Sequence, residues 1–181
     1  FFTADGSKWN VPIVRPPRTA NLVLSPDMKA IGQDVTTFKQ SRDEFEAKGY
    51  AFRKGYLLYG AAGTGKSSMA EIIALQHNMA VYMITLNSKD MTDAILINLV
   101  SRVPSNSLIM FDEIDKQLLS LRENKNASVT VSGLLTAIDG PQRMSEGSIV
   151  LMTSNSRDFL PNAEMVALCR LGRIDVTHEM N

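Results

Sequence analysis

Short apolar runs alternate along this chain with longer segments in which apolar residues recur every three or four positions. Buried strands are predicted for the runs at 56–59, 81–86, 108–111, 148–153 and 174–179. Helices are predicted for the segments at 67–77, 92–102, 131–138 and 162–168. Strands that alternate with helices indicate an α/β fold with a mostly parallel sheet covered on both faces. Such sheets bind ligands beyond the carboxyl ends of their strands, so functional residues are expected just after strands.

The beginning of the chain follows a different pattern. Pro12, Pro16 and Pro17 favour extended backbone, and we expect residues 1–24 to form an arm that connects to a preceding domain. Ser25 followed by proline is typical of a helix N-cap and first turn. Apolar residues then fall on one helical face, at Met28, Ile31, Val35 and Phe38. The folded core is therefore expected over residues 25–181.

Composition narrows the class of protein. The 181 residues (19.9 kDa) suit one domain, and 19 Lys and Arg balance 19 Asp and Glu, so the formal net charge is 19 − 19 = 0. That balance argues against a dedicated nucleic-acid or polybasic membrane binder. The single cysteine, Cys169, excludes an internal disulfide and a multi-cysteine metal site. Because the chain begins with Phe1 rather than Met, we expect it to be a piece of a longer protein.

A phosphate-binding loop is predicted between the first strand of the core and the helix at 67–77. The segment 60–67 reads G-x-x-x-x-G-K-[ST]. Its glycines let successive backbone N–H groups face an anion, and the helix that follows adds the positive end of its dipole. Lys66 can reach the β- and γ-phosphates of ATP, and the Ser67 hydroxyl can bind Mg²⁺. The expected nucleotide-binding residues are Gly60, Ala61, Ala62, Gly63, Thr64, Gly65, Lys66, Ser67 and Ser68.

An acidic pair follows the apolar strand at 108–111. We expect Asp112 to hold Mg²⁺, together with Ser67, and Glu113 to polarise the water that attacks the γ-phosphate. The alternative is a solvated acidic loop after a core strand, which the nearby phosphate loop makes less favoured. Asp115 suits a loop or helix start better than a ligand position.

Four segments together resemble the AAA family of ATPases: GAAGTGKS, LIMFDEID, IVLMTSN and CRLGRID. The segments FRKGYLLYG, VSGLLTAIDG and LMTSN are similar, more narrowly, to the Bcs-type mitochondrial AAA chaperones. The resemblance covers about residues 9–180. It implies a P-loop NTPase fold, namely the large AAA subdomain with a parallel five-stranded sheet between helices, and a chain that stops before the family's helical lid.

The resemblance also implies roles for three further residues. Asn155 stands where the family has a polar sensor that orients the attacking water. Arg170 and Arg173 match the arginines of the R-x-G-R motif, which in a ring reach the neighbour's nucleotide as arginine fingers. Surface ion pairs are the alternative for the arginines, and a turn after the strand is the alternative for Asn155. The segment before Arg170 is about four residues longer than usual, and Leu171 replaces the usual proline.

What the resemblance implies about function is specific. It predicts the Mg²⁺-ATP-hydrolysing core of a ring, a heptamer or hexamer, that moves a folded Rieske iron–sulfur subunit across the mitochondrial inner membrane for assembly of respiratory complex III. The ATPase would face the matrix, and the membrane segment would lie outside this chain. Residues 86–93 contain no aromatic residue or glycine, which favours folded over threaded cargo. A regulatory module with weak hydrolysis, or a Bcs-like paralogue with another client, remains the alternative; no nucleic-acid partner is expected.

Overall fold

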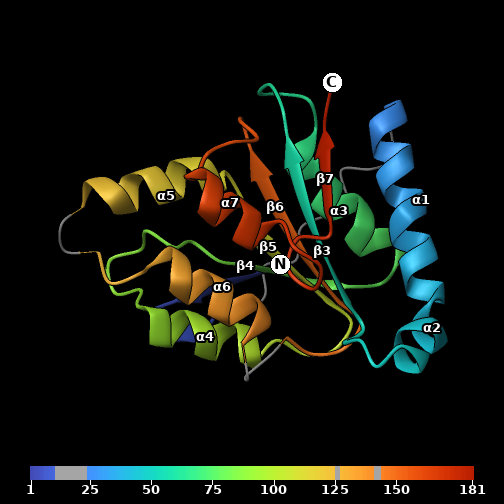
Figure 1. Cartoon of the computed structure of the whole chain (residues 1–181), viewed down its shortest axis with the longest axis horizontal. Helices are drawn as coiled ribbons and strands as arrows, with labels where there is room; N and C mark the ends of the chain where they lie inside the picture. The colour runs from blue at the N-terminus through green and yellow to red at the C-terminus, as the bar shows by residue number, and fades with distance from the viewer. Residues whose placement is uncertain (11–23, 125–126, 141–143) are drawn as a thin grey trace.

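The computed structural model describes residues 1–10, 24–124, 127–140 and 144–181. In these residues a seven-stranded sheet lies between layers of helices (Figure 1). The strands are β1 (Phe2–Asp5), β2 (Lys8–Trp9), β3 (Arg53–Tyr59), β4 (Ala80–Met83), β5 (Ser107–Phe111), β6 (Ser148–Ser154) and β7 (Val176–Glu179). The helices are α1 (Pro26–Gln40), α2 (Arg42–Ala47), α3 (Lys66–Gln76), α4 (Asp93–Ser101), α5 (Ile114–Glu123), α6 (Val131–Asp139) and α7 (Asn162–Leu168).

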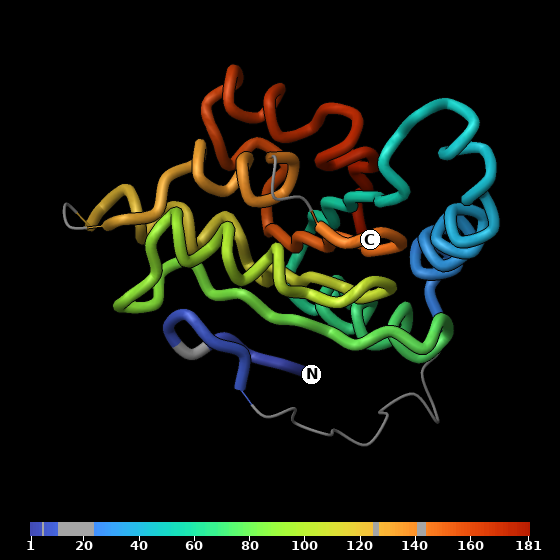
Figure 2. The backbone as a smooth tube through the Cα atoms, turned by 90° about the horizontal axis from the view of Figure 1, so that it is seen from below, coloured from blue at the N-terminus to red at the C-terminus, as the bar shows by residue number. Residues whose placement is uncertain are grey.

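The sheet contains the expected parallel core and is wider than expected at one edge. Its spatial order is β2-β1-β4-β5-β6-β3-β7, in which β4, β5, β6, β3 and β7 run parallel, as the sequence predicts. Beyond those five strands, β1 pairs parallel with β4, and β2 pairs antiparallel with β1. Figure 2 shows this N-terminal segment beside the edge of the sheet.

Aromatic contacts attach the N-terminal segment to this edge. The ring of Phe2 stacks on Tyr82 with centroids 4.5 Å apart, and the ring of Trp9 meets Tyr82 edge-on at 4.9 Å. The indole N–H of Trp9 also donates to the carbonyl of Leu99, at the end of α4 (3.3 Å). The sequence pattern gave no strand signal here, because such short strands are stabilised by these distant contacts. Residues 11–23 lie outside the described part, so the remainder of the connecting arm expected over 1–24 stays a prediction.

Helices α1 and α3 cover one face of the sheet. Ser25 caps α1 by accepting a hydrogen bond from the N–H of Met28 (3.3 Å), as predicted. The predicted apolar face of α1 is buried, and Phe38 packs with Phe45 and Phe52 at centroid distances of 5.6 and 4.7 Å. Burying each such side chain stabilises the fold by about 1.5–3 kcal/mol.

Helices α4, α5, α6 and α7 cover the other face. Helix α5 was not predicted from the sequence, although Ile114, Gln117 and Leu118 recur at helical spacing and are buried. The acidic and basic residues between them concealed that stripe. The omission matters because α5 begins directly after the acidic pair, and its first turn therefore lies beside the predicted site.

The carboxyl ends of three strands of the parallel core lie together, and we call this side of the sheet its carboxyl edge. In the β3–β6 ladder Tyr59 is opposite Ser154, and in the β5–β6 ladder Phe111 is opposite Met152. The segments that follow β3, β5 and β6 are the phosphate loop, the acidic pair and Asn155. The parallel register therefore brings the three predicted motifs to one edge.

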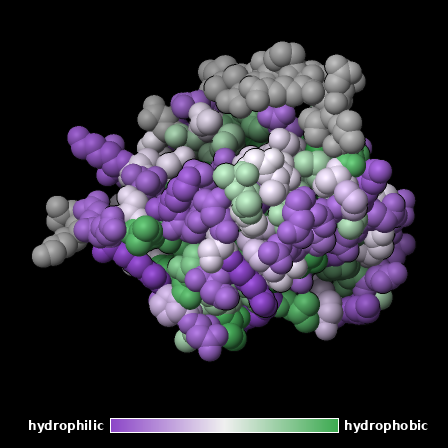
Figure 3. Space-filling model, turned by 90° about the horizontal axis from the view of Figure 1, so that it is seen from above, coloured by the Kyte–Doolittle hydropathy of each residue, from purple (hydrophilic) through white to green (hydrophobic). Residues whose placement is uncertain are grey.

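The surface of the described residues is mixed in character. Figure 3 shows hydrophilic side chains dispersed among smaller hydrophobic groups on one face. Large apolar side chains that are exposed include Tyr50, Leu75, Leu119, Val166 and Leu171. Within the described ranges, none of the helices has the length and apolar character needed to cross a membrane. The same ranges contain no group of three acidic, histidine or cysteine side chains arranged to hold a metal ion.

Candidate functional site

The phosphate loop connects the end of β3 to the start of α3. The φ angles of Gly60, Gly63 and Gly65 are 139°, 88° and 90°, and residues other than glycine rarely adopt such values. At Gly60 a Cβ atom would lie 2.4 Å from the carbonyl oxygen of Met180, so glycine is also required for space. The loop leads directly into the first turn of α3, and a glycine-rich turn before a helix N-terminus is suited to an anion.

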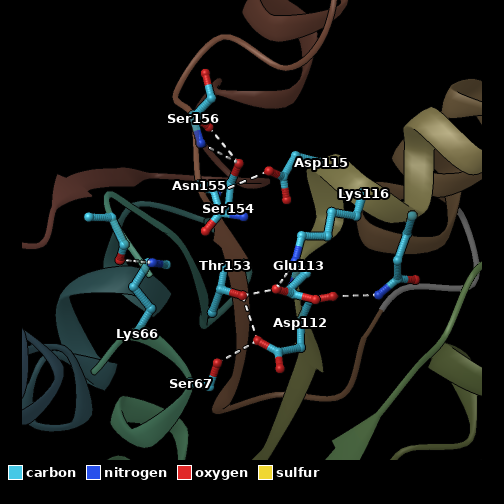
Figure 4. A network of polar contacts seen from close by, with 12 residues as sticks. Lys66, Ser67, Asp112, Glu113, Asp115, Lys116, Thr153, Ser154, Asn155 and Ser156 are labelled. Atoms are coloured by element: carbon cyan, nitrogen blue, oxygen red, sulfur yellow. Dashed lines mark hydrogen bonds and ion pairs between the residues drawn. The ribbon is translucent and has the colours of Figure 1, made fainter. Parts of the chain in front are cut away.

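Lys66 lies in the first turn of α3 with only 8% of its surface exposed. Its ammonium donates hydrogen bonds to the carbonyls of Gly60 (2.7 Å) and Ala61 (2.6 Å) (Figure 4). Among the described residues no carboxylate forms an ion pair with it, so its charge is balanced only by backbone dipoles. A largely desolvated cation of this kind favours a negatively charged ligand.

Ser67 and Asp112 join the phosphate loop to the end of β5. The Ser67 hydroxyl donates to Oδ1 of Asp112 (2.7 Å), and the Thr153 hydroxyl donates to the same oxygen (2.6 Å). Thr153 lies on β6, between the two motifs, and its Oγ1 also accepts from the N–H of Glu113 (2.8 Å). Figure 4 shows the side chains of Ser67, Asp112 and Thr153 converging; Ser67 comes from α3, Asp112 directly follows β5, and Thr153 lies on β6. Thr153 was not among the site residues predicted from the sequence, although it lies in the strand-end segment LMTSN.

Glu113 is the first residue after Asp112, and its backbone is left-handed (φ 49°, ψ 50°). Its carboxylate is about half exposed and forms an ion pair with Lys116, one turn further along α5. The hydrogen bond to Glu113 raises the pKa of the Lys116 ammonium, which therefore stays charged. Because both side chains are exposed to water, the ion pair adds little to stability, and the two groups can separate easily.

A pocket of about 240 Å³ brings most of the predicted residues together. Its lining consists of Ala62, Gly63, Gly65, Lys66, Ser67, Ser68, Glu113, Thr153, Ser154 and Asn155. The N–H of Asn155 donates to Asp115 (3.1 Å), which lies in the first turn of α5. Asp115 is therefore a helix-start residue that holds the segment after β6, in keeping with the sequence interpretation. The lining of this one pocket thus combines the phosphate loop with an acid, a lysine and several hydroxyl-bearing residues.

Arg170 and Arg173 do not reach this pocket. Both contact the carboxylate of Asp139 at the end of α6, Arg170 at 2.9 Å and Arg173 at 3.5 Å. The buried Arg53, which begins β3, binds the same carboxylate. Burial alone would raise the pKa of Asp139, but hydrogen bonds and charge from Arg170 and Arg53 hold it below its usual value. We call these four residues the Asp139 cluster.

The position of the Asp139 cluster separates it from the chain's own phosphate loop. Arg53, a member of the cluster, is the first residue of β3. The phosphate loop follows the last of that strand's seven residues. At about 3.3 Å per residue, roughly 20 Å of strand lies between them. Three guanidinium groups share one carboxylate there, so the cluster carries an excess of positive charge.

Comparisons with known proteins find one matching family and several similar proteins. Residues 56–181 match the ATPase family associated with various cellular activities (AAA). The chain is 35% identical over 167 residues to the probable mitochondrial chaperone BCS1-A of Dictyostelium discoideum, covering 87% of this chain and 38% of that protein. It is 32% identical over 187 residues to human mitochondrial chaperone BCS1, covering 97% and 43%.

A viral protein is also similar to this chain. Protein R776 of Acanthamoeba polyphaga mimivirus, which carries no functional name, is 39% identical over 145 residues, covering 80% of this chain and 46% of the viral protein. The chain thus spans less than half the length of these relatives.

Proposed function

This chain belongs to the AAA family of ATPases, and we propose that it binds ATP with Mg²⁺ and hydrolyses it at the carboxyl edge of its sheet. The observation that carries the proposal is the hydrogen bond between Ser67 and Asp112, because it joins the phosphate loop and the acidic pair. Glu113 and Lys66 line the pocket beside that bond. Phosphate binding, metal binding and water activation thus have candidate groups within one volume.

The residues at the pocket suit Mg²⁺ as well as phosphate. A hydroxyl and a carboxylate are hard oxygen ligands of the type that Mg²⁺ prefers, and Ser67 and Asp112 already share a hydrogen bond. A bound Mg²⁺ neutralises charge that develops on the phosphate oxygens during transfer. Lys66 and the loop N–H groups hold the phosphates, and Thr153 keeps the Asp112 carboxylate oriented.

Glu113 acts on the attacking water in this proposal. Its carboxylate accepts a hydrogen bond from the water and then the proton that the water loses as its oxygen attacks the γ-phosphate. To do so the carboxylate leaves Lys116, which costs little because the ion pair is exposed. Asn155, on the same pocket wall, donates or accepts a second hydrogen bond that fixes the direction of attack.

The arginines act between subunits. Roughly 20 Å of β3 separates Arg170 and Arg173 from the phosphate loop of their own chain, so they would serve the nucleotide of a neighbouring copy. The excess positive charge of the Asp139 cluster suits an approach to phosphate. We therefore propose a ring, of six or seven copies, in which Arg170 completes each neighbour's site.

The similarity to BCS1 supports a more specific role. We propose that the ring is a Bcs-type chaperone that moves folded protein, by family resemblance a Rieske iron–sulfur subunit, across the mitochondrial inner membrane, with this domain in the matrix. Relatives such as BCS1-A are named as mitochondrial chaperones, and these names support the proposed chaperone role and the proposed mitochondrial location. A paralogue with another client is the second candidate, because the 39% identity to the mimivirus protein exceeds the identities to these chaperones.

Replacing Glu113 with glutamine tests hydrolysis. In the intact, assembled protein, Glu113→Gln should keep ATP binding but lower turnover by about 100-fold or more, since the amide cannot accept a proton. Glu123→Gln removes a carboxylate at the exposed end of α5 and should leave turnover unchanged. If Glu113→Gln hydrolyses ATP at the wild-type rate, Glu113 does not activate the water.

Mixing subunits tests the role of Arg170. Arg170→Ala subunits added to wild-type subunits should lower turnover per wild-type site, because each altered subunit leaves its neighbour without a finger. Arg122→Ala is the matched control, since Arg122 forms a comparable exposed ion pair with Glu164 (2.9 Å). Turnover that depends only on the number of wild-type subunits would exclude action between subunits.

A further inference from the structure

A single peptide group connects the two acids of the candidate site, and side chains hold both of its polar atoms. Its N–H, on Glu113, donates to the hydroxyl of Thr153 (2.8 Å). Its carbonyl, on Asp112, accepts from the side-chain amide of Gln117 (2.6 Å). Thr153 comes from β6 and Gln117 from α5, so two separate elements fix the plane of this one peptide.

This peptide needs to be held. Glu113 has a left-handed backbone, a conformation that is strained for any residue with a Cβ atom. Rotation of the peptide would relieve that strain and would change the direction in which the Glu113 side chain leaves the backbone. The two hydrogen bonds oppose the rotation, and they thereby keep the carboxylate on the wall of the pocket.

The other end of the Gln117 amide contacts a different segment. Its Oε1 accepts from the backbone N–H of Leu86 (2.6 Å), three residues beyond the end of β4. Gln117 is only 9% exposed and Leu86 is fully buried. Because one partner is a donor and the other an acceptor, the amide has one orientation that satisfies both. The four residues after Leu86, at 87–90, are exposed.

We propose that Gln117 is a positioning residue that holds the Asp112–Glu113 peptide in the conformation for hydrolysis and couples it to the segment 86–91. The inference rests on the proposed function, because Glu113 must act in hydrolysis for its direction to matter. A displacement of Leu86 would move the Gln117 amide, and the amide would release or rotate the peptide. Contact of a partner with the exposed residues 87–90 would thereby alter the rate of ATP hydrolysis.

Two substitutions test this in the intact, assembled protein. Gln117→Met has a similar length and makes neither hydrogen bond, so kcat should fall by about 10- to 100-fold. The affinity for fluorescent ADP should stay within about threefold of wild type, because the phosphate loop is untouched. Ser145→Ala is the control. It removes a comparable hydrogen bond, to the carbonyl of Val103 (2.6 Å), in the segments that precede β5 and β6, at the end of these strands away from the pocket.

Gln117→Glu supplies a readout that a purely structural role would not move. The ionised carboxylate would repel the carbonyl of Asp112, whereas the protonated form can donate to it as the amide does. Turnover of Gln117→Glu, divided by that of wild type at each pH, should therefore rise as the pH falls. A ratio that stays constant with pH, or a Gln117→Met variant with the kcat of wild type, would overturn the inference.

Hydrogen exchange measures the coupling without requiring hydrolysis. Adding ADP should slow amide exchange in residues 84–91 of the wild-type protein and should have no such effect in Gln117→Met. A wild-type protein that binds ADP but never hydrolyses ATP would contradict the proposed function and the role of Gln117 in hydrolysis, and the exchange result would then decide only the coupling of Gln117 to residues 86–91. An equal ADP response in both proteins, or no response in the wild type, would refute the coupling.

Discussion

Gly133 lies in the first turn of α6, where that helix passes the start of α4. A Cβ atom at this position would lie 1.9 Å from Oδ1 and 2.1 Å from Cγ of Asp93. Asp93 accepts hydrogen bonds from the N–H and the hydroxyl of Thr130, each at 2.8 Å. Thr130 in turn caps α6 by accepting from the N–H of Gly133 (2.9 Å). Gly133→Ala would therefore displace Asp93 and disturb the cap of α6.

The magnitude follows from these contacts. Loss of the two hydrogen bonds to Asp93 costs about 1 kcal/mol each, because the groups are exposed and can bind water instead. Adjustment of the closely packed helices costs about 1–2 kcal/mol more. Alanine regains about 1 kcal/mol through its higher helix propensity. Gly133→Ala should thus destabilise the fold by about 2–3 kcal/mol, or lower Tm by roughly 4–12 °C for a domain of this size.

A double-mutant cycle isolates the cause. In an Asp93→Ala background the clashing carboxylate is gone, so Gly133→Ala should no longer destabilise and should instead stabilise the fold by up to about 1 kcal/mol. Urea unfolding followed by circular dichroism would measure all four proteins. If Gly133→Ala has the same effect with and without Asp93, or leaves Tm unchanged in the wild-type background, the reasoning is wrong.

Three further predictions concern charge and space. Burial lowers the pKa of Lys39 to about 8 in the folded protein. Between pH 8 and 10.5 the unfolded chain therefore binds more protons at Lys39 than the folded chain does. The unfolding free energy of wild type, minus that of Lys39→Met, should rise with pH across that window when both are measured by urea unfolding. Asp139→Asn leaves Arg53 buried without its carboxylate and should cost about 3 kcal/mol in the same assay, whereas a cost under 1 kcal/mol would contradict the importance of the ion pair. Gly60→Ala should abolish binding of fluorescent ADP, because its Cβ would meet the carbonyl of Met180 at 2.4 Å; retained affinity would refute the steric argument.

Acidification should weaken the Asp139 cluster in a defined direction. The pKa of Asp139 is below its usual value in the folded state, so its stabilising effect is complete above the unfolded pKa and is lost as the pH falls through the folded one. The unfolding free energy of wild type should therefore approach that of Asp139→Asn at acid pH. A difference between them that stays constant from neutral to acid pH would argue against the ionised carboxylate as the source of stability.

Features that depend on consecutive residues could be predicted from the amino-acid sequence. The turn of the phosphate loop follows from its own glycines, and the cap of α1 follows from Ser25. The class of fold follows from apolar runs that alternate with helical stripes, because burial of those runs requires helices on both faces of a parallel sheet. The same pattern was sufficient to expect the loop and the acidic pair at one edge.

Contacts between groups that are distant in the sequence became visible only in the folded chain. Thr153 and Gln117 are polar residues in otherwise apolar patterns, and their contacts with Asp112 depend on strand order and on the start of α5. The separation of Arg170 from the phosphate loop likewise depends on which end of β3 it adjoins. The physical reason is range: turn and cap preferences act over a few neighbouring residues, whereas side-chain hydrogen bonds between elements require the whole sheet to be assembled first.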